Sequence, residues 1–455
     1  MRKILGLLLS IVFAFVALVP ANAIEVTNGQ SQTGRWDFAS NGNSILAAWN
    51  NCESEQNSTI YARIQRGSKS WKLPTVIGVG QCYGDLSTAM LANGTSYIFW
   101  LNEGELYFSK SSPSGTTFSS AQKFPKTATQ TVISSKVFAS GNNLTVFVVT
   151  QVDGNLFAET WDLTRNKWKK QTIGDLLPDS VFIKCDIDDE SCAQNIEAPY
   201  LVTNSKGQQV FVISLTQQRV VDSINYSTYA TYVFKRGSSA NAWSREILDS
   251  FGPTDSYISY GVEALTISQK GKIALGMHRG TTENLDGIRF YTSASFTKQL
   301  KPTDTSVVED LEGAFISDIA NVGDDFYATY ARCTNESCTE YFGKLGKLSQ
   351  AKALPTNTIV VSIGTYGGKL RMFTCEVATE LTELDGTISI QTKTKNGWTA
   401  PKVALKLDSA NVKILTVFAE IMFFKSHVLL AADGVYNDGE GDVRLPYGLY
   451  IEKIK

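Results

Sequence analysis

The sequence predicts an all-β protein, a β-propeller of about eight four-stranded blades, with seven as the alternative count. One pattern recurs along the chain: an apolar strand, a short Gly/Asn turn, a second apolar strand, a variable loop and a third strand. Amphipathic helical stretches are hard to find, whereas glycine (35 residues) and aromatic residues (11%) are plentiful. This composition is typical of many short strands joined by turns.

The second strand of the unit is its clearest part. It occurs at residues 45–49, 97–100, 146–149, 210–213, 273–276, 326–329, 370–373 and 428–431. A third strand follows each of these at 60–62, 106–108, 156–158, 231–233, 288–290, 340–342, 388–390 and 449–451. Turns that need positive φ precede the second strand at Asn41-Gly42, Asn93-Gly94, Gly141-Asn142, Lys206-Gly207, Lys270-Gly271, Gly323-Asp324 and Gly367-Gly368. A pair of β-sandwiches is the alternative fold, but sandwiches lack a repeat carried through the whole chain.

The two ends of the chain predict how the ring closes. The last unit stops after its third strand, and residues 24–27 have no unit of their own. We expect residues 24–27 to supply the missing strand, because an open ring would leave strand edges exposed to aggregation.

The first 23 residues predict a secretory signal peptide. A basic start (Arg2, Lys3) precedes an apolar run over 4–19, and Ala21-Asn22-Ala23 has the small residues of a cleavage site. A transmembrane anchor is the alternative, but the run is shorter than the roughly 20 residues that a spanning helix needs. We therefore expect cleavage after Ala23, one propeller domain over 24–455, no membrane span and secretion from the cell.

The charge balance limits the class of partner, and the cysteine positions predict disulfides. The 42 basic and 44 acidic residues are balanced and form no basic tract, which argues against a nucleic-acid partner. All seven cysteines fall in or beside the loops that join second to third strands or one blade to the next, so we call this end of the blades the cysteine-bearing face. In an exported protein these spacings favour disulfides, and we expect the pairs Cys52–Cys82, Cys185–Cys192 and Cys333–Cys338, with Cys375 left over.

No cofactor is expected. Only His278 and His427 exist, and no zinc-ligand spacing appears. The loop at 437–442 alternates oxygen-bearing side chains as calcium loops do, but it departs from the full twelve-residue pattern. We interpret it as a solvated acidic turn, with calcium as the minor alternative.

The repeat resembles the Asp-box (BNR) propellers, the superfamily of the sialidases. Their blades carry Ser-x-Asp-x-Gly-x-Thr-Trp in the turn after the third strand. Residues 111–118 keep the Ser, Gly, Thr and aromatic positions but have Pro113 in place of the Asp. The other blades retain mostly the aromatic residue, as Trp71, Trp168, Trp243 and Trp398. Plain packing within the blade is the alternative explanation for these tryptophans.

The resemblance also implies a set of site residues. Arg35, Arg279 and Arg332 match the three arginines that bind a carboxylate, and Glu263 matches the glutamate that polarises a tyrosine nucleophile. The catalytic set is incomplete, because Val361 stands at the tyrosine position and Asn57 where the acid/base aspartate belongs. The ligand-binding residues expected on the cysteine-bearing face are Arg35, Asp37, Asp85, Tyr260, Arg279 and Arg332.

These observations predict a monomeric, non-catalytic binding protein. We expect it to recognise an extracellular glycan or protein through the cysteine-bearing face, where loops stand on a rigid scaffold. A sialidase-like exo-glycosidase, or another glycan-active enzyme with altered catalytic residues, is the alternative; it would use Glu263 with a second acid such as Asp85 or Glu53. A third interpretation is an assembly scaffold that binds no soluble sugar.

Overall fold

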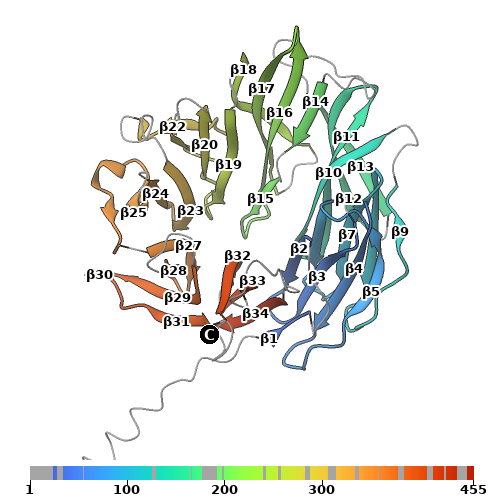
Figure 1. Ribbon diagram of the computed structural model, residues 1–455, viewed down its shortest axis with the longest axis horizontal. Helices are drawn as coiled ribbons and strands as arrows, with labels where there is room; N and C mark the ends of the chain where they lie inside the picture. Colours follow the sequence, from blue (N-terminus) through green and yellow to red (C-terminus); the bar gives the residue numbers. More distant parts are fainter. Residues whose placement is uncertain are drawn as a thin grey trace, which may run out of the picture.

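The protein is an eight-bladed β-propeller in the computed structural model, as the sequence predicts (Figure 1). The structure describes residues 24–27, 34–54, 56–125, 130–164, 167–176, 192–196, 199–238, 242–254, 258–281, 287–305, 314–333, 338–356, 358–377, 384–406, 413–424, 427–437 and 448–454. The signal peptide predicted over 1–23 lies outside these residues. No helix in the described ranges is long and apolar enough to cross a membrane.

The first four blades follow one another in chain order. Blade 1 consists of β2 (Trp36–Ser40), β3 (Ile45–Cys52), β4 (Ser58–Gln65) and β5 (Thr75–Gly80). Blade 2 consists of β6 (Leu86–Met90), β7 (Ser96–Asn102), β8 (Glu105–Ser111) and β9 (Gln122–Lys123). Blade 3 consists of β10 (Thr131–Ser140), β11 (Asn143–Val152), β12 (Asn155–Thr164) and β13 (Lys167–Asp175). Blade 4 has a divided first strand and consists of β14 (Cys192–Ile196), β15 (Tyr200–Thr203), β16 (Gln209–Val221), β17 (Ile224–Arg236) and β18 (Ser244–Thr254).

The last four blades complete the ring. Blade 5 consists of β19 (Ile258–Ile267), β20 (Ile273–Thr281), β21 (Ile288–Thr292) and β22 (Lys301–Thr303). Blade 6 consists of β23 (Ala314–Val322), β24 (Asp325–Cys333), β25 (Cys338–Lys344) and β26 (Lys352–Ala353), with a 3-10 turn η2 (Leu348–Gln350). Blade 7 consists of β27 (Thr358–Tyr366), β28 (Lys369–Val377), β29 (Leu384–Thr394), β30 (Gly397–Trp398) and β31 (Lys402–Lys406). Blade 8 consists of β32 (Lys413–Phe423), β33 (Val428–Asn437), β34 (Gly448–Ile454) and β1 (Ile24–Glu25).

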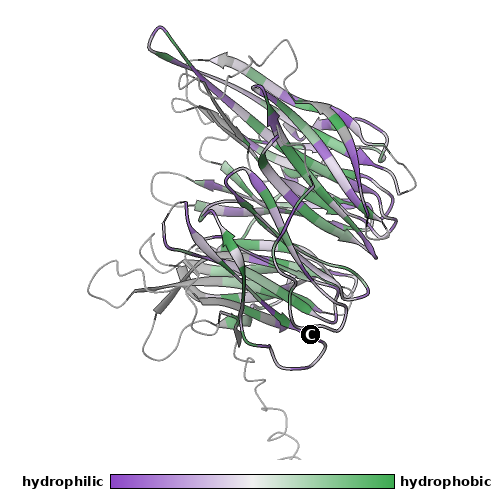
Figure 2. Cartoon of the chain, turned by 90° about the vertical axis from the view of Figure 1, so that its right-hand side faces the viewer, coloured by the Kyte–Doolittle hydropathy of each residue, from purple (hydrophilic) through white to green (hydrophobic). Residues whose placement is uncertain are grey.

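The strands of each blade are antiparallel, and the first strand lies nearest the ring axis (Figure 1). The turns between first and second strands and between third and fourth strands therefore share one end of the ring, which we call the turn face. The loops between second and third strands and between blades share the other end, the cysteine-bearing face. Hydrophobic residues run along the strands, and hydrophilic residues gather toward the turns (Figure 2).

The apolar core of the described residues consists of eight clusters, each drawing its residues from two neighbouring blades. The cluster between blades 1 and 2 shows how close the sheets come. Gly78 and Gly80 of β5 lie against the indole of Trp100 in β7, where a Cβ on Gly78 would come within 2.5 Å of that ring. The Trp100 indole N–H donates a hydrogen bond to the Val79 carbonyl at 2.9 Å. A larger residue at Gly78 would separate the two blades.

The ring closes as predicted, through the strand at residues 24–25. β1 pairs antiparallel with β34, with Ile24 opposite Ile451 and Glu25 opposite Tyr450. The next residue, Val26, is fully buried in the cluster between blades 8 and 1. Its carbonyl accepts a hydrogen bond of 2.7 Å from the Arg63 guanidinium of blade 1. The N-terminal segment thus connects the last blade to the first, through strand pairing with β34 and through contacts with blade 1.

Two of the three predicted disulfides are formed. Cys52–Cys82 links the end of β3 to the segment that leads into blade 2, and Cys333–Cys338 joins the ends of β24 and β25. The third prediction, Cys185–Cys192, involves Cys185, which lies outside the described residues. Cys375 is a buried thiol in β28 and belongs to neither bridge.

We expect Val26→Ala to lower the free energy of unfolding by about 2 kcal/mol, because it removes buried methyl groups at the closure and leaves a cavity. Denaturant unfolding of the mature chain measures this. Val403→Ala is the matched control, since Val403 is a strand residue that is 40% exposed, and it is expected to cost less than about 0.5 kcal/mol. Equal effects of the two substitutions would contradict the role of residues 24–27 in closing the ring.

Candidate functional site

Two of the predicted site residues, Asp37 and Asp85, connect neighbouring blades. Asp37 in β2 is buried, and its Oδ2 accepts hydrogen bonds from the Thr88 backbone N–H (2.5 Å) and hydroxyl (3.1 Å) in β6. Asp85 repeats the arrangement one blade further, where its Oδ2 accepts from the Ser134 hydroxyl (2.8 Å) and the Ser135 N–H (2.7 Å). Both carboxylates are therefore engaged in holding the inner strands of blades 1, 2 and 3 together.

Glu263, the predicted catalytic residue, lies between blades 5 and 6. Its Oε2 accepts a hydrogen bond from the Ile316 N–H at 2.6 Å, and its Oε1 lies 3.1 Å from His278 Nδ1. Asp318 of blade 6 makes the equivalent contact to blade 7, accepting from the Ser362 hydroxyl (2.6 Å) and the Ile363 N–H (2.9 Å). Glu263 thus belongs to a series of carboxylates that bind the inner strand of the next blade; its catalytic role stays a prediction.

Glu340 adds a second contact between blades 6 and 7. This residue of β25 is 2% exposed and accepts hydrogen bonds from the Val360 N–H (3.1 Å) and the Ser317 hydroxyl (2.9 Å). Burial raises the pKa of Glu340 to about 7 and that of Asp318 to about 6, although the hydrogen bonds oppose the shift. Desolvation therefore outweighs hydrogen bonding at both carboxylates.

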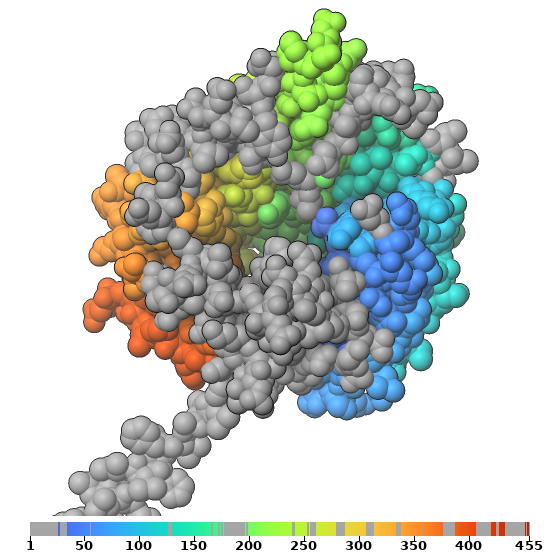
Figure 3. Space-filling view, viewed as in Figure 1, coloured from blue at the N-terminus to red at the C-terminus, as the bar shows by residue number. Residues whose placement is uncertain are grey.

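A group of charged residues interacts between blades 1, 2, 3 and 8, on or next to their inner strands. The Asp37 carboxylate makes the largest contribution that raises the pKa of Lys136, and Glu420 and Asp85 act in the same direction. Burial and Asp37 raise the pKa of Glu420 above its ordinary value, whereas Lys136 lowers it. Glu420 is nonetheless exposed and Lys136 half-buried, so water reaches both inside the ring. The space-filling view shows a hollow near the middle of the face drawn there (Figure 3).

Two of the three predicted arginines, Arg35 and Arg332, make local contacts in their own parts of the ring. Arg35 is exposed, and its Nε donates to the Tyr83 carbonyl at 3.2 Å. Arg332 in β24 stacks on Tyr330 and Tyr341 of its own blade, with its guanidinium carbon 5.8 and 5.0 Å from the ring centroids. The backbone of Tyr260 lies opposite that of Arg279 in blade 5. The binding roles of all these residues stay predictions.

The described residues hold no group of three or more His, Cys, Asp and Glu side chains that could bind a metal ion. Most of the acidic loop at 437–442, where calcium is the minor alternative, lies outside them.

The structure contains a cavity on the turn face, between blades 2 and 3, with a volume of about 450 Å³. Its walls carry hydroxyl and amide groups together with two leucines and one lysine. The lining residues are Leu91, Asn93, Thr95, Tyr97, Lys110, Ser111, Ser112, Pro113, Ser119, Asn142 and Leu163. This volume is within the usual range of small-molecule sites, which is about 300–1,000 Å³.

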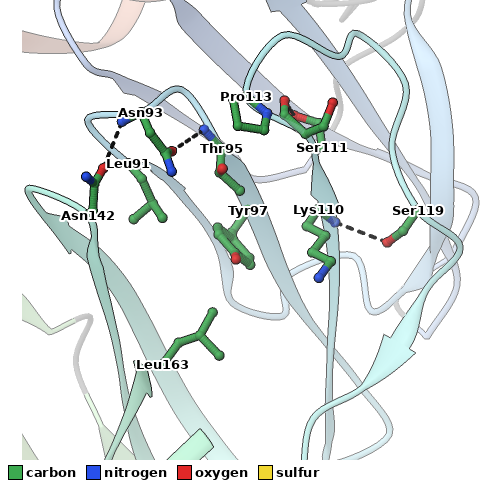
Figure 4. A pocket seen from close by; sticks show the side chains of 11 residues that line it. Leu91, Asn93, Thr95, Tyr97, Lys110, Ser111, Pro113, Ser119, Asn142 and Leu163 are labelled. Carbon is green, nitrogen blue, oxygen red and sulfur yellow. Dashed lines mark hydrogen bonds between the residues drawn. The ribbon is translucent and has the colours of Figure 1, made fainter. Parts of the chain in front are cut away.

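Tyr97 lies at the centre of this cavity, with Leu163 of blade 3 opposite (Figure 4). Its ring is 3% exposed and stacks on Phe99, and burial raises its pKa. No hydrogen bond to another described residue occupies its hydroxyl. The Lys110 side chain projects beside it, and Asn93 and Asn142 close one end (Figure 4). The cavity thus presents a polar atom on an otherwise buried ring.

Arg66 of blade 1 holds the outer wall of the cavity in place. Its guanidinium donates to the Gly94 carbonyl (2.5 Å), the Ser111 hydroxyl (2.9 Å), the Ser112 carbonyl (3.0 Å) and the Gly115 carbonyl (2.8 Å). These residues include the turn at 111–118 that resembles the Asp-box. One rigid guanidinium therefore fixes two turns of blade 2 at the rim.

The sequence did not reveal this cavity. Its residues come from turns and strands of two blades that the repeat pattern identified separately, and no single segment carries a motif. The start of the second strand in blade 2 could have pointed to the cavity, because Tyr97 follows the Asn93-Gly94 turn there. The cysteine-bearing face, where binding was expected, is the opposite end of the ring.

Comparisons with known proteins leave the function open. No protein-family model matches this chain, and no curated protein matches it in sequence. Among solved structures it is similar to the Dos1 propeller, with 7% identity over 95% of both chains and a TM-score of 0.49. It is also similar to the NanB sialidase from Streptococcus pneumoniae (8% identity, 95% of this chain and 97% of that chain, TM-score 0.38). The SapL1 lectin in complex with alpha methyl fucoside is similar at 11% identity, over 73% of this chain and 98% of that chain, with a TM-score of 0.34. At these scores the likeness carries no argument about function, which rests on the chain's own residues.

We expect the protein to lose stability as the pH rises from 5 to 8, in part because of Glu340. A carboxyl with a raised pKa in the folded state stabilises that state fully below its unfolded pKa, near 4.5, and loses this contribution as the pH rises through about 7. Glu340→Gln stays uncharged and keeps an acceptor for Val360 and a partner for Ser317. This variant is expected to lose about 3 kcal/mol less of its free energy of unfolding than wild type does over the same pH range.

Denaturant unfolding at pH 5 and pH 8 checks this expectation. Glu53→Gln, at an exposed loop residue, is the control and is expected to retain the wild-type dependence. An unchanged pH dependence in Glu340→Gln would show that burial does not govern this carboxyl.

Proposed function

We propose that this chain is a secreted, non-catalytic binding propeller that recognises a glycan in the cavity between blades 2 and 3. One observation carries the proposal: Tyr97, 3% exposed, directs a hydroxyl without a partner among the described residues into a 450 Å³ cavity. The hydroxyl oxygen is not among the fully buried atoms, so water reaches it, and a ligand hydroxyl can take the place of that water and keep its hydrogen bond. The predicted signal peptide supports a ligand outside the cell.

The walls of the cavity match the chemistry of a sugar. Sugars present many hydroxyl groups on a ring that also has apolar C–H faces. The amides of Asn93 and Asn142 and the hydroxyl of Thr95 can exchange hydrogen bonds with such hydroxyls. The side chains of Leu91 and Leu163 offer apolar contact to the C–H faces. A few polar groups on a partly apolar wall are the usual composition of a small-molecule site.

The same walls support binding rather than turnover. Hydrolysis of a glycoside ordinarily uses a pair of carboxyl groups on either side of the scissile bond. No aspartate or glutamate of the described residues lines this cavity. The predicted acids Asp85 and Glu263 are instead bonded to backbone N–H groups of the next blade. The sialidase-like enzyme is therefore the second candidate.

The test is a binding assay on the purified mature chain, first across a glycan array and then by calorimetry with the best ligand. We expect Tyr97→Phe to weaken binding about 3- to 10-fold, because it removes one hydrogen bond and leaves the ring in place. Leu163→Ala is expected to weaken binding as well, through lost apolar contact.

Two matched variants locate the ligand. Tyr107→Phe removes a hydroxyl from a tyrosine of the neighbouring strand that does not line the cavity, and it is expected to bind as wild type. Arg279→Ala reports on the predicted site of the cysteine-bearing face. Unchanged affinity in both cavity variants, combined with loss in Arg279→Ala, would overturn the proposed cavity and move the site to the other face.

A further inference from the structure

A second cavity lies beside the first, between blades 3 and 4, with a volume of about 290 Å³. Leu163 of β12 lines both, so the two cavities are adjacent on the turn face. Polar and charged groups dominate the second one, among them Asp162, Lys206, Gln209 and Arg236. Leu163 packs toward blade 2 and its neighbour Asp162 bonds Arg236 of blade 4, so the two cavities lie on either side of the blade 3 sheet. A ligand longer than one sugar ring would have to cross the turn-face edge of that sheet to contact both.

Arg236 forms a fixed wall of the second cavity. Its Nε donates to Gln209 Oε1 (2.7 Å), its Nη1 to Asp162 Oδ2 (2.7 Å) and its Nη2 to Thr145 Oγ1 (2.8 Å). The guanidinium carbon also lies 4.7 Å from the centroid of the Trp243 ring. The side chain is only 10% exposed and is held by these bonds, so its orientation is set before any ligand arrives.

This arrangement leaves donors for an anion. A guanidinium has five N–H donors, and the three bonds above leave two of them without a partner among the described residues. Lys206 also lines the cavity, is exposed and forms no ion pair within the described ranges. Asp162 offsets one of these two positive charges, which leaves one net positive charge at this cavity.

The first cavity has a positive charge too. Lys110 lines it, and no carboxylate does within the described part of the chain. Both cavities are thus electropositive, although the whole chain has a net charge of −2. A ligand that spans them would gain from carrying negative charge, and most from a carboxylate near Arg236 and Lys206.

We propose that the two cavities form one extended site for an acidic oligosaccharide. One sugar residue lies in the first cavity against Tyr97, and a neighbouring residue directs a carboxylate toward Lys206 and the fixed guanidinium of Arg236. The inference rests on the proposed function and adds the ligand's charge and length to it.

The experiment compares two ligands that differ only in charge: a trisaccharide of uronic acids and its carboxyl-reduced, neutral counterpart. Affinities are measured by calorimetry for wild type and for Lys206→Gln at low salt. We expect Lys206→Gln to weaken the acidic ligand about 5- to 10-fold and to leave the neutral one unchanged. Raising the salt to about 0.3 M is expected to weaken only the acidic ligand in wild type, because screening acts on charged pairs.

Lys301→Gln is the matched control, since Lys301 is an exposed strand residue of blade 5 away from both cavities. Arg236 is left intact, because its bonds connect blades 3 and 4 and its loss would disturb the fold.

The outcomes separate the two proposals. Equal affinity of wild type for both ligands, or an equal effect of Lys206→Gln on both, would overturn the acidic extension. If Tyr97→Phe still weakened both ligands in that case, the first cavity would stand as a neutral sugar site. No effect of Tyr97→Phe and of Leu163→Ala on either ligand would overturn the first cavity as the sugar site, and with it the proposed function.

Discussion

The ring depends on hydrogen bonds that carboxylates accept from the inner strand of the next blade. An inner strand pairs on one side only, so its backbone N–H groups need other acceptors when they are buried. Asp37, Asp85, Glu263, Asp318 and Glu340 supply them across four of the eight blade interfaces in the described chain. Several of these N–H groups flank β-bulges, where the regular ladder is interrupted, as at Ile316 and Val360. Apolar packing holds neighbouring blades together, and these polar contacts fix the position of one blade against the next.

The same constraint explains why sequence motifs for catalysis and for blade packing are hard to separate. A carboxylate on an inner strand is what a propeller enzyme would use for chemistry, and it is also what an inner strand needs for its N–H groups. Glu263 and Asp85 fit both roles in the sequence, and the structure shows the second. The charged residues Lys136 and Glu420 were absent from the predicted set, because their interaction with Asp37 joins blades 1, 3 and 8 and has no local pattern.

The fold was predictable from the sequence because its signals are local and repeated. Alternating apolar strands and turns such as Asn93-Gly94 recur often enough to define the blades, and the unassigned residues 24–27 identified the closing strand. Two disulfides followed from cysteine spacing alone. The binding cavity was not predictable, since Tyr97 and Leu163 are ordinary apolar strand positions within their own blades. Only the packing of blade 2 against blade 3 turns them into opposite walls of one cavity.

The closing strand has a consequence for the order of folding. Ile24 pairs with Ile451, so the contact that completes the ring joins residues from opposite ends of the chain. A ribosome delivers the N-terminus first, and β1 then has no partner until the last blade has been made. Loop closure over so long a span is entropically costly and slow compared with the formation of a single blade. Early blades can assemble against their neighbours while the ring is still open, and the final seam forms only once the whole chain is available.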